Sequence, residues 1–140
     1  MTRAGRAYAP GEAEGPALVL SEPLSLWGGI DVETGTIIDR AHPHAAASVA
    51  GTILVMRSGR GSSSSSAVLA EAVRRGTGPA AIVLATPDPI LTVGAIVAAS
   101  LYGIECPVVV CPIDGLTTGV RLRVTADDWG TATVMVTGTG

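Results

Sequence analysis

The segment Gly59-Arg-Gly-Ser-Ser-Ser-Ser-Ser66 carries the residue types best suited to chemistry in this 140-residue chain. It stands between an apolar run at residues 51–56 and a stretch with helical spacing, where a strand is expected to pass into a helix. The free N–H groups at the start of a helix carry partial positive charge, and Arg60 adds a permanent cation. We therefore predict an anion site surrounded by serine hydroxyls, where the small residue Gly61 lets a ligand approach the backbone.

The residues alone leave other interpretations of this segment open. A serine can simply cap the helix while the remaining hydroxyls are solvated, and this needs no ligand. A nucleotide-binding P-loop is excluded because that motif requires a lysine, and the chain contains none. The segment lacks the third glycine of a dinucleotide-binding fingerprint, and no G-x-S-x-G elbow supports a self-contained hydrolase.

Two other places carry polar residues with functional potential. Gly29 and Asp31 can line the same mouth as Ser62, although Asp31 is equally suited to bonding the backbone of its own turn. His42 and His44 flank a proline and lack a partner cysteine or a carboxylate pair. The sequence therefore predicts no metal site in this chain.

The elements expected to position these residues alternate between strands and helices. The predicted strands cover residues 17–20, 36–39, 51–56, 80–85, 107–111, 119–125 and 131–137, and the predicted helices cover residues 63–75 and 92–102. The alternation in the middle of the chain is typical of a parallel sheet with crossover helices, and the last two strands have the alternation of an antiparallel pair. We predict an α/β fold with a parallel-sheet core and flanking antiparallel strands.

Residues 1–16 are polar and rich in glycine, alanine and glutamate. This composition predicts a flexible N-terminal arm, followed by a single domain over residues 17–140.

Composition also limits the partners and the compartment. The net charge is −3, so no excess of positive charge favours nucleic acid or an anionic membrane. The strongest candidate for a membrane span lies between Asp88 and Glu105 and has sixteen residues, fewer than the roughly 20 that a spanning helix needs. No apolar signal core follows the N-terminus, and Cys106 and Cys111 are expected to be buried, reduced thiols. We expect a cytoplasmic protein.

Five separated segments occur in the order found in one protein family. They are Leu26-Trp-Gly-Gly-Ile-Asp-Val-Glu-Thr-Gly-Thr-Ile-Ile-Asp39, His42-Pro43, Ser48-Val-Ala-Gly-Thr-Ile-Leu-Val55, Gly59-Arg-Gly-Ser-Ser-Ser64 and Gly94-Ala-Ile-Val-Ala98. Together they resemble the small-subunit, swivelling domain of the aconitase X family over roughly residues 15 to 125. The chain departs from the family pattern at Ser65, where a glycine is expected, at Thr86, where an acidic residue is common, and at Ala45-Ala46-Ala47.

The resemblance implies a swivelling β/β/α domain like the mobile fourth domain of aconitase. It also implies a dehydratase, a hydro-lyase that is inactive without a large subunit, in a heterodimer or a larger assembly. No cofactor is expected in this chain, because the family's iron–sulfur cluster is bound by the cysteines of the large subunit. The serine that follows Gly-Arg-Gly is the family's proton acceptor and corresponds to Ser62.

The chemistry of the residues and the resemblance lead to one hypothesis, the dehydration of a small β-hydroxy acid in which Ser62 removes the α proton. Serine is a weak base at neutral pH, so helix amides and Arg60 are expected to stabilise its oxyanion. The residues expected to contact substrate are Arg60, Gly61, Ser63, Ser64, Gly29 and Asp31.

Known family members dehydrate cis-3-hydroxy-L-proline or mevalonate 5-phosphate, and the chain offers a preference between them. A lysine-free composition rich in alanine and arginine is typical of a GC-rich bacterium and favours cis-3-hydroxy-L-proline. Mevalonate 5-phosphate remains an alternative because a phosphate suits an anion site at a helix end. A non-catalytic binding or regulatory module is the alternative from another functional class.

Overall fold

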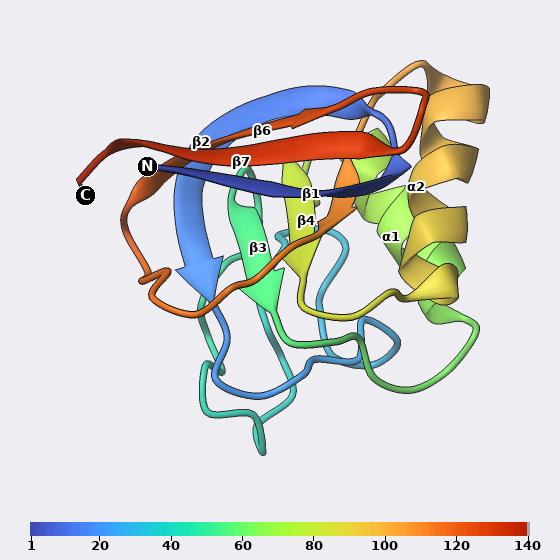
Figure 1. The fold of residues 1–140 in the computed structure, drawn as a ribbon. Coiled ribbons are helices and arrows are strands. Elements are labelled where there is room, and N and C mark those ends of the chain that lie inside the picture. The colour runs from blue at the N-terminus through green and yellow to red at the C-terminus, as the bar shows by residue number, and fades with distance from the viewer. Residues whose placement is uncertain (140) are drawn as a thin grey trace.

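The structure, a computed structural model, describes residues 1–139 as a closed seven-stranded barrel with two helices packed on one side (Figure 1). The elements are β1 Thr2–Ala9, β2 Gly11–Val19, β3 Ile53–Met56, α1 Ser65–Arg75, β4 Ala81–Leu84, α2 Pro89–Tyr102, β5 Val108–Val110, β6 Arg121–Ala126 and β7 Thr131–Gly138. The strands follow the order β1-β5-β4-β3-β2-β6-β7, and pairing between β1 and β7 closes the barrel.

Strands β2 to β5 run parallel, and β3 and β4 are buried on both faces. Alternate side chains belong to two cores. Ile53 and Val55 pack inside the barrel, whereas Leu54 and Met56 pack in the core that the barrel shares with the helices. The predicted unit of parallel strands with crossover helices is therefore present over β3, α1, β4, α2 and β5.

The N-terminal residues correct two predictions. Residues 1–16 do not form a loose arm, because they build β1 and most of β2, and β1 pairs antiparallel with both β5 and β7. The sheet is consequently a mixed closed barrel rather than a parallel core with flanking strands. A Cβ on Gly5 would overlap the carbonyl oxygen of Val110, so a close approach of backbones requires glycine where a strand pattern would place a larger residue.

One predicted strand is missing from the structure, and the predicted antiparallel pair at the end of the chain is present. The expected strand at residues 36–39 is reduced to two isolated bridges, Ile30 with Ile37 and Thr36 with Ser48. The last two predicted strands are the antiparallel pair β6 and β7.

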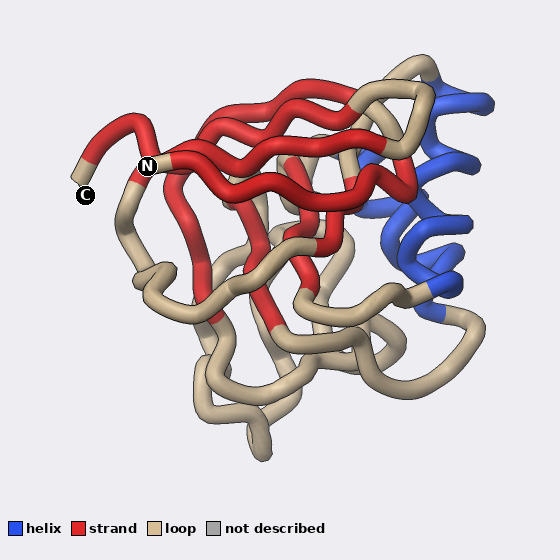
Figure 2. The backbone as a smooth tube through the Cα atoms, in the orientation of Figure 1, coloured by secondary structure: helices blue, strands red, loops and turns tan. Residues whose placement is uncertain are grey.

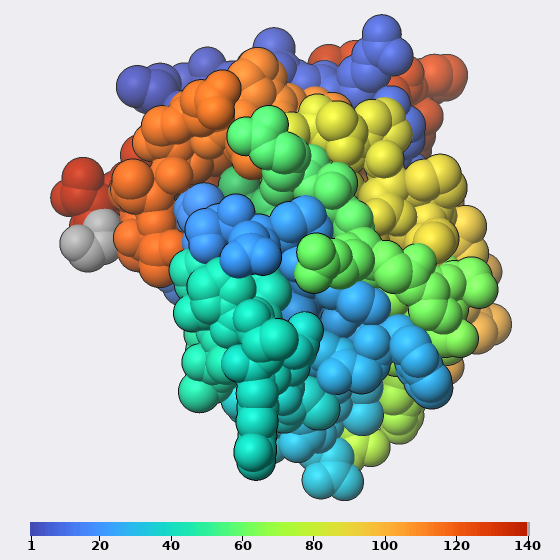
Figure 3. All heavy atoms as spheres, turned by 90° about the horizontal axis from the view of Figure 1, so that it is seen from below, coloured from blue at the N-terminus to red at the C-terminus, as the bar shows by residue number. Residues whose placement is uncertain are grey.

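Loops gather at the end of the barrel where β2, β3 and β4 finish (Figure 2). Seen from that end, residues 20–30, the green segment around residue 60 and the yellow segment around residue 88 lie side by side (Figure 3). Open α/β sheets bind ligands at the corresponding edge, beyond the carboxyl ends of parallel strands. Within residues 1–139 neither helix combines the length and apolarity needed to cross a membrane.

Candidate active site

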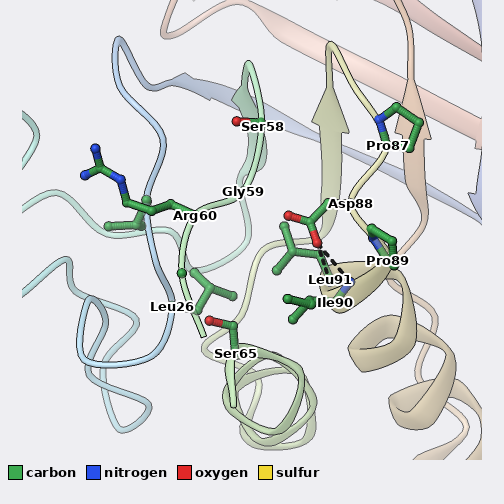
Figure 4. A pocket seen from close by; sticks show the side chains of 12 residues that line it. Leu26, Ser58, Gly59, Arg60, Ser65, Pro87, Asp88, Pro89, Ile90 and Leu91 are labelled. Carbon is green, nitrogen blue, oxygen red and sulfur yellow. Dashed lines mark hydrogen bonds between the residues drawn. The ribbon is translucent and has the colours of Figure 1, made fainter. Parts of the chain in front are cut away.

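A cleft of about 250 Å³ opens between the loop that follows β3 and the first turn of α2 (Figure 4). Residues 58–61 form one wall and residues 87–91 form the other, with Leu24 and Leu26 at the side. Most of the side chains that line the cleft are apolar, and the carboxylate of Asp88 lies among them. Ligand pockets commonly have this composition, an apolar wall with few polar groups that fix orientation.

Gly59 and Gly61 let this loop pass close to its neighbours. Gly61 has a φ of +94°, and a Cβ added there would lie 2.5 Å from the hydroxyl oxygen of Ser25. A Cβ on Gly59 would overlap the carboxylate of Asp88. Both glycines are therefore required by the packing of the loop against Asp88 and Ser25.

Ser62 follows Gly61 directly in the chain and is half-buried, but Ser62, Ser63 and Ser64 are not among the residues that line the cleft. Its hydroxyl oxygen accepts a hydrogen bond from the backbone N–H of Ser64 at 3.1 Å. Its carbonyl oxygen accepts the N–H of Ser65 at 3.0 Å. The side chain of Ser62 thus has a main-chain donor at the start of α1, where the helix dipole is positive. The neighbouring Ser63 and Ser64 are exposed.

The last two serines of the run hold the surrounding segments in place. Ser65, only 2% exposed, accepts a hydrogen bond from the backbone N–H of Trp27 at 3.1 Å. The hydroxyl of Ser66 donates to the carbonyl oxygen of Ile90 at 2.6 Å. These two bonds connect the start of α1 to the loop before residue 30 and to the start of α2.

Asp88 is the residue of this cleft that the sequence analysis missed. One carboxylate oxygen accepts the N–H groups of Ile90 at 2.9 Å and Leu91 at 3.0 Å, so Asp88 caps α2. The other oxygen lies against Gly59. The signal for the cap was present as an aspartate between two prolines ahead of an apolar helix. The sequence contains no signal that Asp88 lies next to Gly59, because the two residues are 29 positions apart in the chain.

Arg60 takes a different position from the one expected. It lines the cleft, but its guanidinium extends away from Asp88 and Ser65 (Figure 4). The side chain is exposed, and Arg60 has no ion pair within residues 1–139. In this arrangement the oxyanion expected at Ser62 has a backbone N–H as its neighbour.

The structure does not place Gly29 and Asp31 among the residues that line the cleft. Asp31 accepts the N–H of Glu33 at 2.9 Å through its side chain, which is the turn-forming role considered for it. Gly29 is buried, and a Cβ there would overlap the carbonyl oxygen of Ser25. Gly29 therefore shapes the loop that carries Trp27.

A family model described as the aconitase X swivel domain matches residues 2–134 of the chain. The chain belongs to this family. The swivel domain includes β1, so the resemblance extends further towards the N-terminus than the sequence motifs covered.

Three relatives illustrate the similarity of this swivel domain to known proteins. A "Cis-3-hydroxy-L-proline dehydratase" of Hypocrea jecorina is 37% identical over 134 residues, which are 96% of this chain and 22% of that protein. A "Phosphomevalonate dehydratase small subunit" of Thermococcus gammatolerans is 36% identical over 126 residues, 89% of this chain and 91% of the relative. A crystal structure of Thermococcus kodakaraensis aconitase X in its holo-form matches with a TM-score of 0.84 and 34% identity, covering 96% of this chain and 98% of that chain. The chain thus spans about a fifth of the length of the fungal protein.

The residues of this swivel domain do not fit an iron–sulfur cluster. Residues 1–139 contain no group of three or more histidine, cysteine or acidic side chains able to hold a metal ion. Cys106 and Cys111 are both free and buried, and burial raises the pKa of Cys106 to about 12. His42 is buried, and both of its ring nitrogens form hydrogen bonds, one with the carbonyl oxygen of Glu22 and one with the N–H of His44.

Proposed function

We propose that the chain is the small, swivelling subunit of an aconitase X-type dehydratase and that Ser62 removes the α proton of cis-3-hydroxy-L-proline. The substrate would be held by a large subunit in a heterodimer or a larger assembly. Family membership and the names of the relatives support the dehydratase. The hydrogen bond from the N–H of Ser64 to the hydroxyl oxygen of Ser62 carries the assignment of the base.

The proposed step requires a negatively charged Ser62 oxygen. The C–H bond at the α carbon breaks, its electron pair forms a double bond to the β carbon, and the β hydroxyl leaves with the electrons of its own bond. The proton goes to the oxygen of Ser62. A serine oxygen is a weak base unless its anion is stabilised, and the N–H of Ser64 at the positive end of α1 provides such stabilisation. Closure against the large subunit would exclude water and strengthen this interaction.

The charge in the cleft favours cis-3-hydroxy-L-proline as the substrate. Asp88 places a carboxylate on the wall of the cleft, while the guanidinium of Arg60 extends away from it. A carboxylate attracts the ring ammonium of a proline derivative and repels a phosphate. Mevalonate 5-phosphate is the second candidate because the Thermococcus relative is named for it and because Arg60, whose guanidinium suits a phosphate, lines the cleft.

Co-purification of the chain with its large subunit under anaerobic conditions, followed by steady-state kinetics, tests this function. We expect Ser62→Ala to lower kcat about 10³-fold, with KM changed less than about twofold, because a general base contributes on this scale. Ser63→Ala removes the same atom one residue away and should lower kcat less than about tenfold.

A Ser62→Ala complex that turns over at the wild-type rate would remove Ser62 from the mechanism. A wild-type complex that binds the large subunit but dehydrates neither substrate would instead support the non-catalytic module.

A further inference from the structure

Helix α2 exposes an unusual amount of apolar surface. Its sequence, PILTVGAIVAASLY, contains no charged residue. Five of the ten large hydrophobic side chains exposed on the described residues lie in α2 or just after it, namely Val93, Ile96, Leu101, Tyr102 and Ile104. Clustered apolar side chains of this kind mark interaction sites, unlike scattered single ones.

The neighbouring helix α1 has a charged outer side of the kind expected for a helix in contact with water. Its outer side carries Glu71, which pairs with Arg74 at 2.7 Å and with Arg75 at 3.7 Å. Helix α2 has no charged side: its inner residues Gly94 and Ala98 are buried, and its exposed residues are apolar apart from Ser100 and the hydroxyl of Tyr102. A helix whose outer side is largely apolar is normally covered on that side as well.

The packing of α2 prevents it from turning its outer side inwards. Ser66 on α1 donates a hydrogen bond to the carbonyl oxygen of Ile90, and a Cβ on Gly94 would lie 2.7 Å from the carbonyl oxygen of Ser66. The two helices therefore touch through backbone atoms at one fixed rotation. Val93, 50% exposed, and Ile96, 47% exposed, remain on the outside of the molecule, where α2 forms its edge (Figure 1).

We propose that the outer face of α2, formed by Val93, Ile96 and Leu101, packs against the large subunit of the dehydratase. This inference rests on the function proposed above. The first turn of α2 lines the cleft that the large subunit has to cover, so the α2 outer face continues directly from the site that this partner completes.

The lengths of the relatives point to the same occupant. The chain corresponds to 22% of the fungal dehydratase, so most of that enzyme lies outside the swivel domain and is available to cover the helix. Interfaces of permanent complexes are more hydrophobic than those of transient ones. The α2 outer face carries no charge and therefore suits a permanent partner.

Binding of the purified large subunit to variants of this chain, measured by calorimetry, tests the inference. The double variant Val93→Glu and Ile96→Glu places two charges on the α2 outer face without burying them in the fold, because both residues are about half exposed. We expect the Kd to rise about 100-fold or more, because charges at the centre of an apolar interface are strongly unfavourable. Trp129→Glu, at a side chain 91% exposed in the turn before β7, is the matched control and should leave the Kd unchanged.

Each outcome is informative when circular dichroism shows that the variants are folded. An unchanged Kd for the double variant would overturn the inference and leave the proposed function intact. A wild-type chain that dimerises through this face, so that the double variant is monomeric but binds the large subunit normally, would also overturn it. Loss of binding in the double variant, together with full activity of Ser62→Ala, would support the inference and contradict the proposed base.

Discussion

Asp88 combines two tasks in one side chain. One oxygen caps α2 by accepting the N–H groups of Ile90 and Leu91, and the other lies against Gly59 in the cleft. The cap stabilises the fold, whereas in the proposed function the charge in the cleft selects the substrate. The two tasks are separable, because asparagine caps a helix about as well as aspartate but carries no charge.

Asp88→Asn is therefore expected to lower kcat/KM for cis-3-hydroxy-L-proline about tenfold, the usual effect of losing a charged hydrogen-bond partner. Its thermal stability should stay close to that of the wild type. Asp88→Ala should in addition lose about 1 kcal/mol of unfolding free energy, measured by urea denaturation. An unchanged kcat/KM in the asparagine variant would show that this carboxylate does not contact the substrate ammonium.

Cys106 couples the stability of the fold to alkaline pH. Burial raises the pKa of its thiol from 9.0 to about 12 in the folded chain. The folded state therefore retains a proton that the unfolded state loses. The resulting stabilisation is present below pH 9 and is lost as the pH rises towards 12, by up to about 1.4 kcal/mol per pH unit.

Urea unfolding of the wild type and of Cys106→Ala at pH 8, 9 and 10 measures this dependence. The difference in unfolding free energy between the two proteins should shrink above pH 9, because only the wild type has this thiol to deprotonate. A difference that stays constant from pH 8 to pH 10 would contradict the burial of a neutral thiol.

Sequence reasoning located the serine loop and, through the family resemblance, assigned roles to Ser62, Ser63 and Ser64, but it assigned none to Ser65. Ser62 and Ser65 are the same residue type in one run, and only the contact between Ser65 and Trp27 shows that Ser65 supports the loop. This contact joins positions 38 apart in the chain. The orientation of Arg60 was equally out of reach, because an exposed side chain has no neighbour in the chain that fixes it.

At the scale of elements, the contact between α1 and α2 fixes the geometry of the cleft. Gly94 removes the side chain that would otherwise separate the helices, and Ser66 binds the first turn of α2 directly. Because the starts of both helices border the cleft, their spacing determines its width.

Gly94→Ala is expected to destabilise the protein by about 1–3 kcal/mol, because the added Cβ would press on the carbonyl oxygen of Ser66. Alanine favours a helix by about 1 kcal/mol over glycine, so destabilisation would identify the backbone contact as the dominant effect. Ser100→Ala, on the exposed side of the same helix, should change the unfolding free energy by less than about 0.5 kcal/mol. A stabilised Gly94→Ala variant would show that the helices can move apart without cost.

The elements with a clear apolar pattern could be predicted from the sequence. The element that depends on pairing with strands far along the chain could not. The buried strands β3 and β4 have apolar runs that identify them directly. Strand β1 consists mostly of small and charged residues, and its partners β5 and β7 lie about 100 positions or more further along the chain. No local pattern can show that such a segment completes a barrel.

At the scale of the whole molecule, β1 closes the barrel by bridging β5 and β7. Removal of residues 1–9 would leave an unpaired edge on each of these strands, and unpaired edges promote aggregation. We expect the shortened chain to lose its cooperative thermal transition or to elute as aggregates in size-exclusion chromatography. A monomeric product with an unchanged Tm would show that β1 is dispensable for the fold.

The proposed mechanism as a whole depends on Ser62 taking a proton from carbon. A single-turnover experiment with cis-3-hydroxy-L-proline deuterated at the α carbon examines this step in the reconstituted complex. The wild type should form product several-fold more slowly from the deuterated substrate than from the ordinary one, and Ser62→Ala should be about 10³-fold slower than the wild type with either substrate. Product formation by Ser62→Ala at the wild-type rate, with the same isotope effect, would contradict the account.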